Sequence, residues 1–242
     1  MKNLLRTIMG RHVAWRLRRR SRPYVFSSGP ILVVAPHADD ETLGCGGLIA
    51  LKRARGETVD VVFVSDSAGA PPVPGLGARR RVEALAALAA LGVTGEQIHF
   101  LDAPDGQLNR LPVAESSRVV EALRSLIGQT QATEIFVPFL GGGSSEHDAT
   151  VALVRTANFN HGQLWEYPVW AWWDPRRLTG QLDHPEQNYH LPLAGARQRK
   201  LVALACHASQ VEPQTRGGKP ALPPVLARLC TGPVEFFFQR QP

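Results

Sequence analysis

The residues best able to do chemistry stand together in PHADDETLGCGG, residues 36–47. Within this stretch His37 is followed by Asp39, Asp40 and Glu41. Buried charges must be paired or bound to a cation, so a histidine and three acids at a strand end favour a divalent metal. His37 and Asp40 offer the nitrogen and oxygen ligands that suit zinc, while the turn aims Asp39 elsewhere. Helix N-capping is the structural alternative, and it explains one acid better than three.

A stable metal site needs a third protein ligand from elsewhere in the fold. His147 is the candidate, because it follows a glycine-rich loop after a predicted strand and would lie just ahead of a helix. That position puts it at the same edge of the sheet as His37. Two histidines and one carboxylate with open positions suit Zn²⁺-dependent hydrolysis, and they also suit Fe²⁺ or another divalent metal.

Short β-branched runs alternate with longer helical patterns from residue 31 onward. This alternation is typical of βαβ units and predicts an α/β fold with a Rossmann-like parallel sheet flanked by helices. Loops at Ala68–Gly77 and Leu140–Ser145 follow strands, so both should converge on the crevice at the carboxyl ends of the sheet. The expected strands are Ile31–Ala35, Val59–Val64, Gln97–Leu101 and Glu134–Pro138, and the expected helices are Glu41–Arg55, Arg79–Leu91, Ala114–Leu126 and Ala149–Asn158.

The pattern changes beyond residue 160, where an aromatic stretch runs from Leu164 to Trp173 and a helix is expected near Ala194–Cys206. We expect a small C-terminal region that caps the site. Its aromatic rings could stack on a sugar face, although core positions are more typical of such rings. The Pro-, Gly- and Lys-rich piece from Glu212 to Pro224 predicts a mobile loop.

The N-terminal segment carries most of the net charge of +6, with eight Lys and Arg residues before residue 23. Leu5, Met9, Val13 and Leu17 recur at four-residue steps and form one apolar stripe between the arginines. This pattern predicts peripheral membrane contact through residues 1–22. A helix docked on the protein itself and a disordered basic tail are the alternatives. Nucleic-acid binding is not expected, because no recognition motif continues into the rest of the chain.

The remaining composition fits one domain, and we divide the chain into a basic amphipathic segment at 1–28 and a catalytic domain at 29–242. Three scattered cysteines without CxxC spacing suggest neither a disulfide framework nor a thiolate zinc cluster. No apolar run approaches the length of roughly 18 residues that spans a bilayer. We therefore expect a cytoplasmic protein, with contact at the inner face of the membrane if the N-terminal segment binds lipid.

The stretch PHADDE resembles the PHPDDE signature of the PIG-L/LmbE-like family of N-acetylglucosaminyl deacetylases. Further similar pieces follow in order over about residues 31–238: Val64–Gly69, Arg80 with Glu83, Pro104–Gly106, EHDA around His147, Glu166–Pro168 and His207–Gln210. The resemblance implies hydrolysis of the acetamide of an N-acetylated sugar conjugate, releasing acetate and a free amino sugar. It makes His37, Asp40 and His147 the metal ligands and Asp39 the catalytic general base.

The resemblance implies supporting roles for other residues. Glu41 is expected to support the site or cap a helix. Asp105 would orient a histidine or form an ordinary Asp-Gly turn. Arg80 would meet an anionic group of the substrate or pair with Glu83. His207 recurs in the family pattern, although a packed core histidine is the alternative.

Two positions depart from the family pattern. Ala38 replaces the usual proline, a small change. The usual H-P-D-H appears here as residues 144–147, Ser-Ser-Glu-His, so Ser144 replaces the histidine thought to stabilise the oxyanion. Loss of such a donor typically costs about 10²–10³ in rate, so another group should replace it. The candidates are His184, His190, His207 and the Gly141–Gly143 amides.

Two other functions compete with deacetylation. A catalytically silent sugar- or lipid-binding relative would explain the missing oxyanion histidine, but it has no physical need for a base beside a metal. A nucleotide-binding Rossmann domain would use Gly44, Gly46 and Gly47. Those glycines lie inside a predicted helix, and the preceding acids would repel a pyrophosphate.

Overall fold

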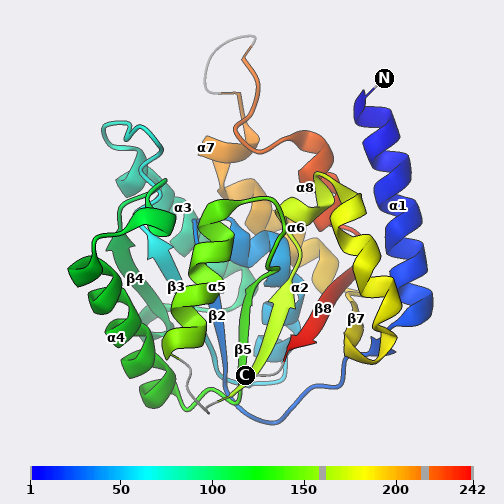
Figure 1. The fold of residues 1–242 in the computed structure, drawn as a ribbon, viewed down its shortest axis with the longest axis horizontal. Coiled ribbons are helices and arrows are strands. Elements are labelled where there is room, and N and C mark those ends of the chain that lie inside the picture. The colour runs from blue at the N-terminus through cyan, green and yellow to red at the C-terminus, as the bar shows by residue number, and fades with distance from the viewer. Residues whose placement is uncertain (1, 158–161, 214–217, 241–242) are drawn as a thin grey trace.

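The computed structural model describes residues 2–157, 162–213 and 218–240. Its centre is an eight-stranded sheet with the order β1-β7-β8-β6-β5-β2-β3-β4 (Figure 1). Strands β2 to β6 pair in parallel, and β8 runs antiparallel between β6 and β7. The strands are β1 (Arg22–Pro23), β2 (Ile31–Ala35), β3 (Val59–Ser65), β4 (Ile98–Ala103), β5 (Glu134–Pro138), β6 (Gln163–Tyr167), β7 (Asn188–Pro192) and β8 (Val234–Arg240). The predicted α/β fold with a mostly parallel sheet is confirmed.

Helices cover both faces of the sheet (Figure 1). Alternate residues of β2 belong to different cores: Ile31 and Val33 pack with α2, whereas Leu32 and Val34 pack with α4 and α5. Burial on both faces explains why β2 is apolar throughout and why β3 and β5 are mostly apolar. The α-helices are α1 (Lys2–Arg20), α2 (Asp40–Ala54), α3 (Leu76–Leu91), α4 (Val113–Thr130), α5 (Ser145–Ala157), α6 (Ala196–Cys206), α7 (Ala208–Val211) and α8 (Pro224–Cys230).

Short 3-10 helices complete the chain: η1 (Gly95–Gln97), η2 (Leu108–Arg110), η3 (Trp170–Trp172), η4 (Pro175–Asp183) and η5 (Pro185–Gln187). The C-terminal region therefore does more than cap the site, because it supplies β6, β7 and β8 to the sheet. Trp165 and Trp172 are buried in the core, as most rings of this stretch were expected to be, while Trp170 and Trp173 are partly exposed.

The predicted element bounds hold to within a few residues, with one difference that matters for the site. Helix α5 begins at Ser145 rather than at Ala149, so His147 lies in its first turn and not ahead of it. The Ser144 Oγ accepts the N–H of His147 at 3.4 Å and extends the helix start. The predicted end of this helix, Asn158, lies outside the described residues, as do residues 214–217 of the predicted mobile loop.

The N-terminal segment is a helix docked on the protein by its second half. Val13 and Leu17 are buried, and a Cβ on Gly10 would meet Leu229 at 2.8 Å. The first half stands along the side of the molecule, with its end pointing the same way as the carboxyl ends of the parallel strands (Figure 1). None of the helices in the described part of the chain has the length and apolarity needed to cross a membrane.

Candidate active site

The turn between β2 and α2 holds the predicted chemical residues in an unusual backbone conformation. Asp39 has φ 135°, a region that non-glycine residues rarely adopt. Its N–H donates to Glu41 Oε2 at 2.9 Å. On either side of Ala38, the Ser67 Oγ accepts the N–H at 2.9 Å and the Gln210 amide donates to the carbonyl. Contacts from three separate segments therefore hold the backbone of this turn.

The three predicted metal ligands come together at the carboxyl ends of β2 and β5. His37 Nδ1 lies 3.3 Å from Asp40 Oδ2, and His147 Nε2 lies 3.2 Å from the same oxygen. Ligand atoms about 2.0–2.1 Å from a tetrahedral zinc are separated by about 3.3 Å, so the observed spacing suits such an ion. All three ligand atoms lie within 4.8 Å of one another.

An orphaned atom supports the same interpretation. His147 is 2% exposed, and within the described residues its buried Nε2 has no hydrogen-bond partner. The Asp40 oxygen lies close enough but does not meet the angular requirements of a hydrogen bond. Buried ring nitrogens without partners are rare, because each costs the desolvation of a polar atom; within the described residues His207 Nδ1 is another, but it lies away from the other candidate ligands. A cation between His147, Asp40 and His37 would satisfy this nitrogen.

The other side of the His37 ring faces two carboxylates. Asp105 Oδ1 lies 3.2 Å from Nε2, and Glu146 Oε2 lies 3.9 Å away. Both carboxylates also accept backbone N–H groups, Asp105 from Gly69 at 2.8 Å and Glu146 from Gly106 at 3.0 Å. A proton on Nε2 directed at Asp105 leaves Nδ1 free to bind a cation, which is the usual support for a metal-binding histidine. A second conceivable metal group, His37 with Asp105 and Glu146, would give up this support.

The charges of the site act strongly on one another. Burial raises the pKa of Asp40, but the neighbouring His147 and His37 outweigh it and hold that pKa well below its usual range. Burial and the negative charge of Asp40 raise the pKa of Asp39. Burial lowers the pKa of His37, yet hydrogen bonds with Asp105, Asp40 and Glu146 raise it well above normal. The negative charges of Asp40, Asp105 and Glu146 therefore favour a cation at His37, either a proton on the ring or a bound metal ion.

Glu41 and His207 form a buried pair beneath the turn. His207 Nε2 lies 3.0 Å from Glu41 Oε1, and both side chains are completely buried. The same oxygen accepts the Thr42 hydroxyl at 2.6 Å. Glu41 therefore connects the Asp39 backbone to α7, and His207 is the packed histidine that was given as the alternative to a binding role.

Arg80 faces the site rather than its own helix. Its Nη1 donates to the Ser67 carbonyl at 3.1 Å and lies 4.0 Å from Asp105 Oδ2. Glu83 instead meets Arg79 at 2.9 Å and Ser209. Within the described part of the chain, the buried Arg80 Nε has no hydrogen-bond partner.

Two candidates for the missing oxyanion donor lie away from the site. His184 is largely exposed beside Glu186. His190 meets Ser21 at 2.8 Å on β7, which is four strands from β2. In the glycine loop, the N–H of Gly141 donates to Asp148 and that of Gly142 to Phe139. Gly143 is the remaining amide of that loop.

The glycines of PHADDETLGCGG have a packing function. Gly44, Gly46 and Gly47 lie inside α2. A Cβ on Gly44 would stand 2.1 Å from the Tyr167 ring, and one on Gly47 would stand 2.2 Å from Leu193. These glycines let α2 approach its neighbours, so they do not form a phosphate-binding loop.

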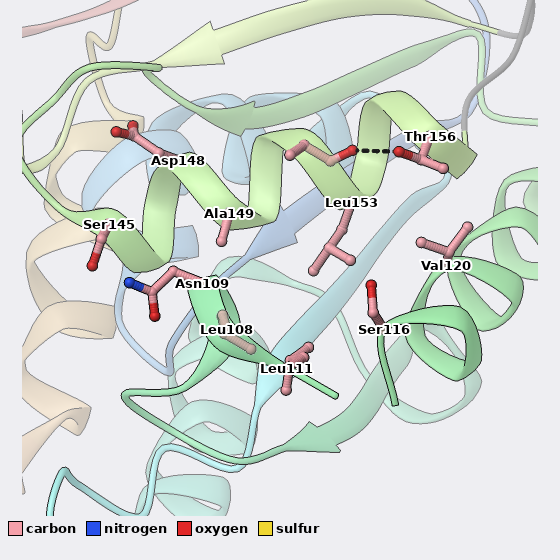
Figure 2. Close-up of a pocket in the computed structure, with 11 residues that line it drawn as sticks. Leu108, Asn109, Leu111, Ser116, Val120, Ser145, Asp148, Ala149, Leu153 and Thr156 are labelled. Atoms are coloured by element: carbon pink, nitrogen blue, oxygen red, sulfur yellow. Dashed lines mark hydrogen bonds between the residues drawn. The ribbon is translucent and has the colours of Figure 1, made fainter. Parts of the chain in front are cut away.

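A cavity of about 510 Å³ lies between α5, η2 and α4 (Figure 2). Ser145, Ala149 and Leu153 of α5 face residues of η2 and α4 across it. Its carboxylate, Asp148, accepts the Gly141 N–H at 2.7 Å. None of the three metal-ligand candidates lines this cavity.

Several residues of the site were not found from the sequence. Glu146, Ser67 and Gln210 lie in segments that resemble the family pattern. Their contacts with His37 and with the Ala38 backbone depend on loop conformation, which the sequence does not reveal. Lys200 and Glu235 form a buried pair against α2, 2.6 Å apart, with no local sequence signal.

The sequence model of the family described as PIG-L, GlcNAc-PI de-N-acetylase, matches residues 32–158, which is more than half of the chain. The chain belongs to the PIG-L family. The resemblance to this family is therefore confirmed, and the predicted deacetylase class and GlcNAc-type substrate agree with the family's description. No curated protein matches the sequence.

Solved structures of PIG-L-like deacetylases share this fold. The N,N'-diacetylchitobiose deacetylase from Pyrococcus horikoshii is 22% identical, with a TM-score of 0.54, covering 74% of this chain and 69% of that one. A deacetylase of teicoplanin biosynthesis is 19% identical, with a TM-score of 0.62, covering 87% and 97%. GalB from Pseudomonas putida, a 4-carboxy-2-hydroxymuconate hydratase, is 16% identical, with a TM-score of 0.64, covering 88% and 97%. The fold is thus shared by a hydratase, so the chemistry must be argued from the site.

Proposed function

We propose that this PIG-L family member hydrolyses the acetamide of an N-acetylglucosamine conjugate with a divalent cation held by His37, Asp40 and His147. The orphaned His147 Nε2, 3.2 Å from Asp40 Oδ2, is the observation that carries the metal assignment. When bound, the cation polarises the amide carbonyl and makes water a stronger acid. Zn²⁺ fits the donor set, and Fe²⁺ is the second candidate. A related structure is described as the zinc-inhibited form of the teicoplanin deacetylase Orf2, so the metal needs a direct test.

Asp39 is the proposed general base. The backbone of Ala38 and Asp39 is held by Glu41, Ser67 and Gln210. Asp39 takes a proton from the attacking water and returns it to the departing amine. Asp105 holds the His37 ring, and Arg80 lies behind Asp105 with its Nη1 4.0 Å from Asp105 Oδ2. We propose the Gly143 amide as the donor that replaces the family's oxyanion histidine.

The test measures free-amine release from a panel of N-acetylglucosamine derivatives by protein loaded separately with Zn²⁺, Fe²⁺ and Co²⁺, with a chelated control. We expect chelator-sensitive turnover. Asp39→Asn should lower kcat by about 10²–10⁴ while bound metal stays stoichiometric, because a general base supplies that factor. Wild-type rates in Asp39→Asn would contradict the base assignment, and the absence of bound metal in the wild type would overturn the site.

We also propose that α1 contacts an anionic membrane surface. Leu4, Leu5 and Ile8 are 64%, 61% and 57% exposed on its first half, and arginines follow along the same helix. Exposed apolar side chains beside cations suit an interfacial helix on acidic lipid. We propose a cytoplasmic location at the inner face of a membrane, which such a contact would require. The three cysteines are free thiols, which suits a reducing compartment.

Vesicle co-sedimentation tests this contact. Substitution of Leu4, Leu5 and Ile8 by Ser changes exposed residues only, whereas removal of α1 would uncover the surface that Val13 and Leu17 cover. We expect the triple variant to lose binding to vesicles with 30% anionic lipid, and neither protein to bind neutral vesicles. Equal binding of the wild type and the triple variant to the anionic vesicles would contradict the proposal. The division into a basic segment at 1–28 and a catalytic domain at 29–242 is a proposal about the sequence alone. In the structure α1 and β1 pack on the rest of the protein.

A further inference from the structure

The loop between β5 and α5 contains three successive glycines, Gly141–Gly143, which give it more backbone freedom than any other residue type would. Gly141 and Gly143 have φ 75° and 102°, values that side chains with a Cβ rarely adopt. A single conformation of such a loop needs contacts from outside it. The residues that supply these contacts therefore decide where the amides of the loop point.

Two charged side chains hold Gly141 by both of its backbone groups. The N–H donates to Asp148 Oδ1 at 2.7 Å, and the carbonyl accepts an N–H of Arg177 Nη1 at 3.1 Å. The Arg177 side chain also lies against Gly143, where a Cβ would stand 3.0 Å from the Arg177 Nε. Hydrogen bonds to charged groups are stronger than those between neutral groups, so these two side chains fix the peptide planes on either side of Gly141.

The same loop is bonded to the helix that carries a proposed metal ligand. Asp148 follows His147 in the first turn of α5, and its own N–H donates to the Ser144 carbonyl at 3.1 Å. The N–H of His147 donates to the Ser144 Oγ at 3.4 Å. Because these contacts join the loop to the start of α5, its position is set relative to His147.

Arg177 comes from η4, which the family match at residues 32–158 does not include. Its side chain is exposed, but η4 is anchored, because Leu178 and Leu182 are buried and Arg20 of α1 donates to the Leu182 carbonyl at 3.1 Å. Exposed side chains usually contribute little to the free energy of unfolding. An effect of Arg177 on the loop can therefore be separated from an effect on folding.

These contacts leave one amide of the glycine loop without a partner. The N–H of Gly142 donates to the Phe139 carbonyl at 3.2 Å, and that of Gly141 is taken by Asp148. Within the described residues, the Gly143 N–H makes no hydrogen bond. We propose that Arg177 is a positioning residue that holds the Gly143 amide toward the amide carbonyl of the substrate. The inference rests on the proposed function, in which this amide stabilises the oxyanion.

Steady-state kinetics of metal-loaded, full-length protein test the proposal on the N-acetylglucosamine derivative that the wild type hydrolyses fastest. Arg177→Gln should lower kcat by about 10–10²-fold and leave KM unchanged, because a misplaced donor is lost mainly in the transition state. Arg177→Lys, which can still donate to the Gly141 carbonyl, should recover part of the loss. Arg176→Gln is the matched control and should change neither constant, since Arg176 is an exposed neighbour that pairs with Asp174 at 2.7 Å.

Metal affinity, measured by competition with a chelator, should be the same in the wild type and in Arg177→Gln. An unchanged kcat, a change in KM alone, or a loss of metal affinity would each overturn the proposal.

Hydrogen exchange of the peptide 139–144 gives a measurement that does not depend on turnover. Faster exchange in Arg177→Gln, but not in Arg176→Gln, is expected because the amides of Gly141 and Gly142 would open more often. Equal exchange in both variants rejects the role of Arg177. If the wild type hydrolyses no derivative while the exchange difference is present, the proposed function fails and the hold of Arg177 on the loop stands.

Discussion

Helix α2 meets buried charge in two places, at its N-terminus and in its middle. At the N-terminus, His37, Asp40 and His147 surround a point where the His147 Nε2 lacks a hydrogen-bond partner in the described structure. In the middle, Lys200 donates to Glu235 at 2.6 Å and to the Leu43 carbonyl at 2.8 Å.

The middle cluster is also completed by the helix backbone. Glu235 accepts the N–H groups of Gly47 and Leu48 at 2.7 and 2.9 Å. Both clusters are largely buried, but in the described part of the chain only the middle cluster has hydrogen-bond partners for its polar side-chain atoms. The middle pair needs no further partner, whereas the cluster at the N-terminus has a ring nitrogen that a bound cation would satisfy.

Breaking the satisfied pair should have the largest effect on folding. Lys200→Met leaves the Glu235 charge buried without its partner and should lower the free energy of unfolding by about 3–5 kcal/mol. Urea denaturation measures the loss. Adding Glu235→Gln should recover part of it, because the uncompensated charge is removed. Arg124→Met, at an exposed pair with Glu121, is the control and should change stability by less than about 1 kcal/mol. Similar losses in both single variants would remove the contrast.

The unsatisfied cluster should respond differently, because its stability depends on the ligand. Zn²⁺ at 100 times its dissociation constant should stabilise the wild type by about 2.7 kcal/mol. His147→Ala should abolish this metal-dependent increment, whereas Lys200→Met should retain it. Thermal denaturation with metal and with chelator measures both increments. A full increment in His147→Ala would place the metal elsewhere.

A smaller effect is expected from the support of His37. Asp105→Asn removes the carboxylate that lies 3.2 Å from the His37 Nε2, while the three ligands remain. Loss of such a support typically costs 10–100-fold in metal affinity, about 1.4–2.8 kcal/mol. Competition with a chromophoric chelator measures the affinity, and Asp102→Asn, which changes an exposed carboxylate, is the control. An unchanged affinity in Asp105→Asn would reduce its role to that of a turn residue.

The sequence predicted the cluster of proposed metal ligands but not the buried pair of Lys200 and Glu235, and the reason is physical. His37, Asp39 and Asp40 are neighbours whose residue types conflict with burial, and parallel strands bring His147 to the same edge. The pairing of Lys200 with Glu235 joins segments far from α2 in sequence, and neither residue stands out locally. The four-residue spacing of apolar side chains predicted the stripe on α1. The spacing alone did not show that Val13 is buried and Leu5 is exposed.

Loop conformation explains the remaining omissions. The position of Glu146 beside His37 depends on α5 beginning at Ser145, four residues earlier than the helical pattern predicts. The strained φ of Asp39 likewise has no sequence signature. Strain of this kind persists only where neighbours impose it, so it becomes visible once Ser67 and Gln210 are placed.

The smallest expected effect concerns the buried pair of Glu41 and His207. Its two charges are paired, as in the middle cluster, but within the described residues His207 Nδ1 has no hydrogen-bond partner, as at the N-terminus of α2. Burial lowers the pKa of His207, but the charge of Glu41 outweighs this and raises the pKa above its unfolded value of about 6.5. A raised folded pKa stabilises the protein fully below the unfolded pKa, and this contribution is lost as pH rises through the folded pKa.

Glu41→Gln should therefore lower the free energy of unfolding by about 1 kcal/mol at pH 5.5 and by less at high pH, since a neutral amide no longer favours the imidazolium. Urea denaturation of metal-loaded protein from pH 5.5 to 9 measures the difference between wild type and variant. The comparison cancels the titrating groups that do not interact with Glu41; Asp39, whose pKa Glu41 raises, is not among them. A difference independent of pH would mean that His207 stays neutral and that Glu41 acts only by holding the Asp39 N–H, which would make the pair a purely geometric support of the catalytic turn.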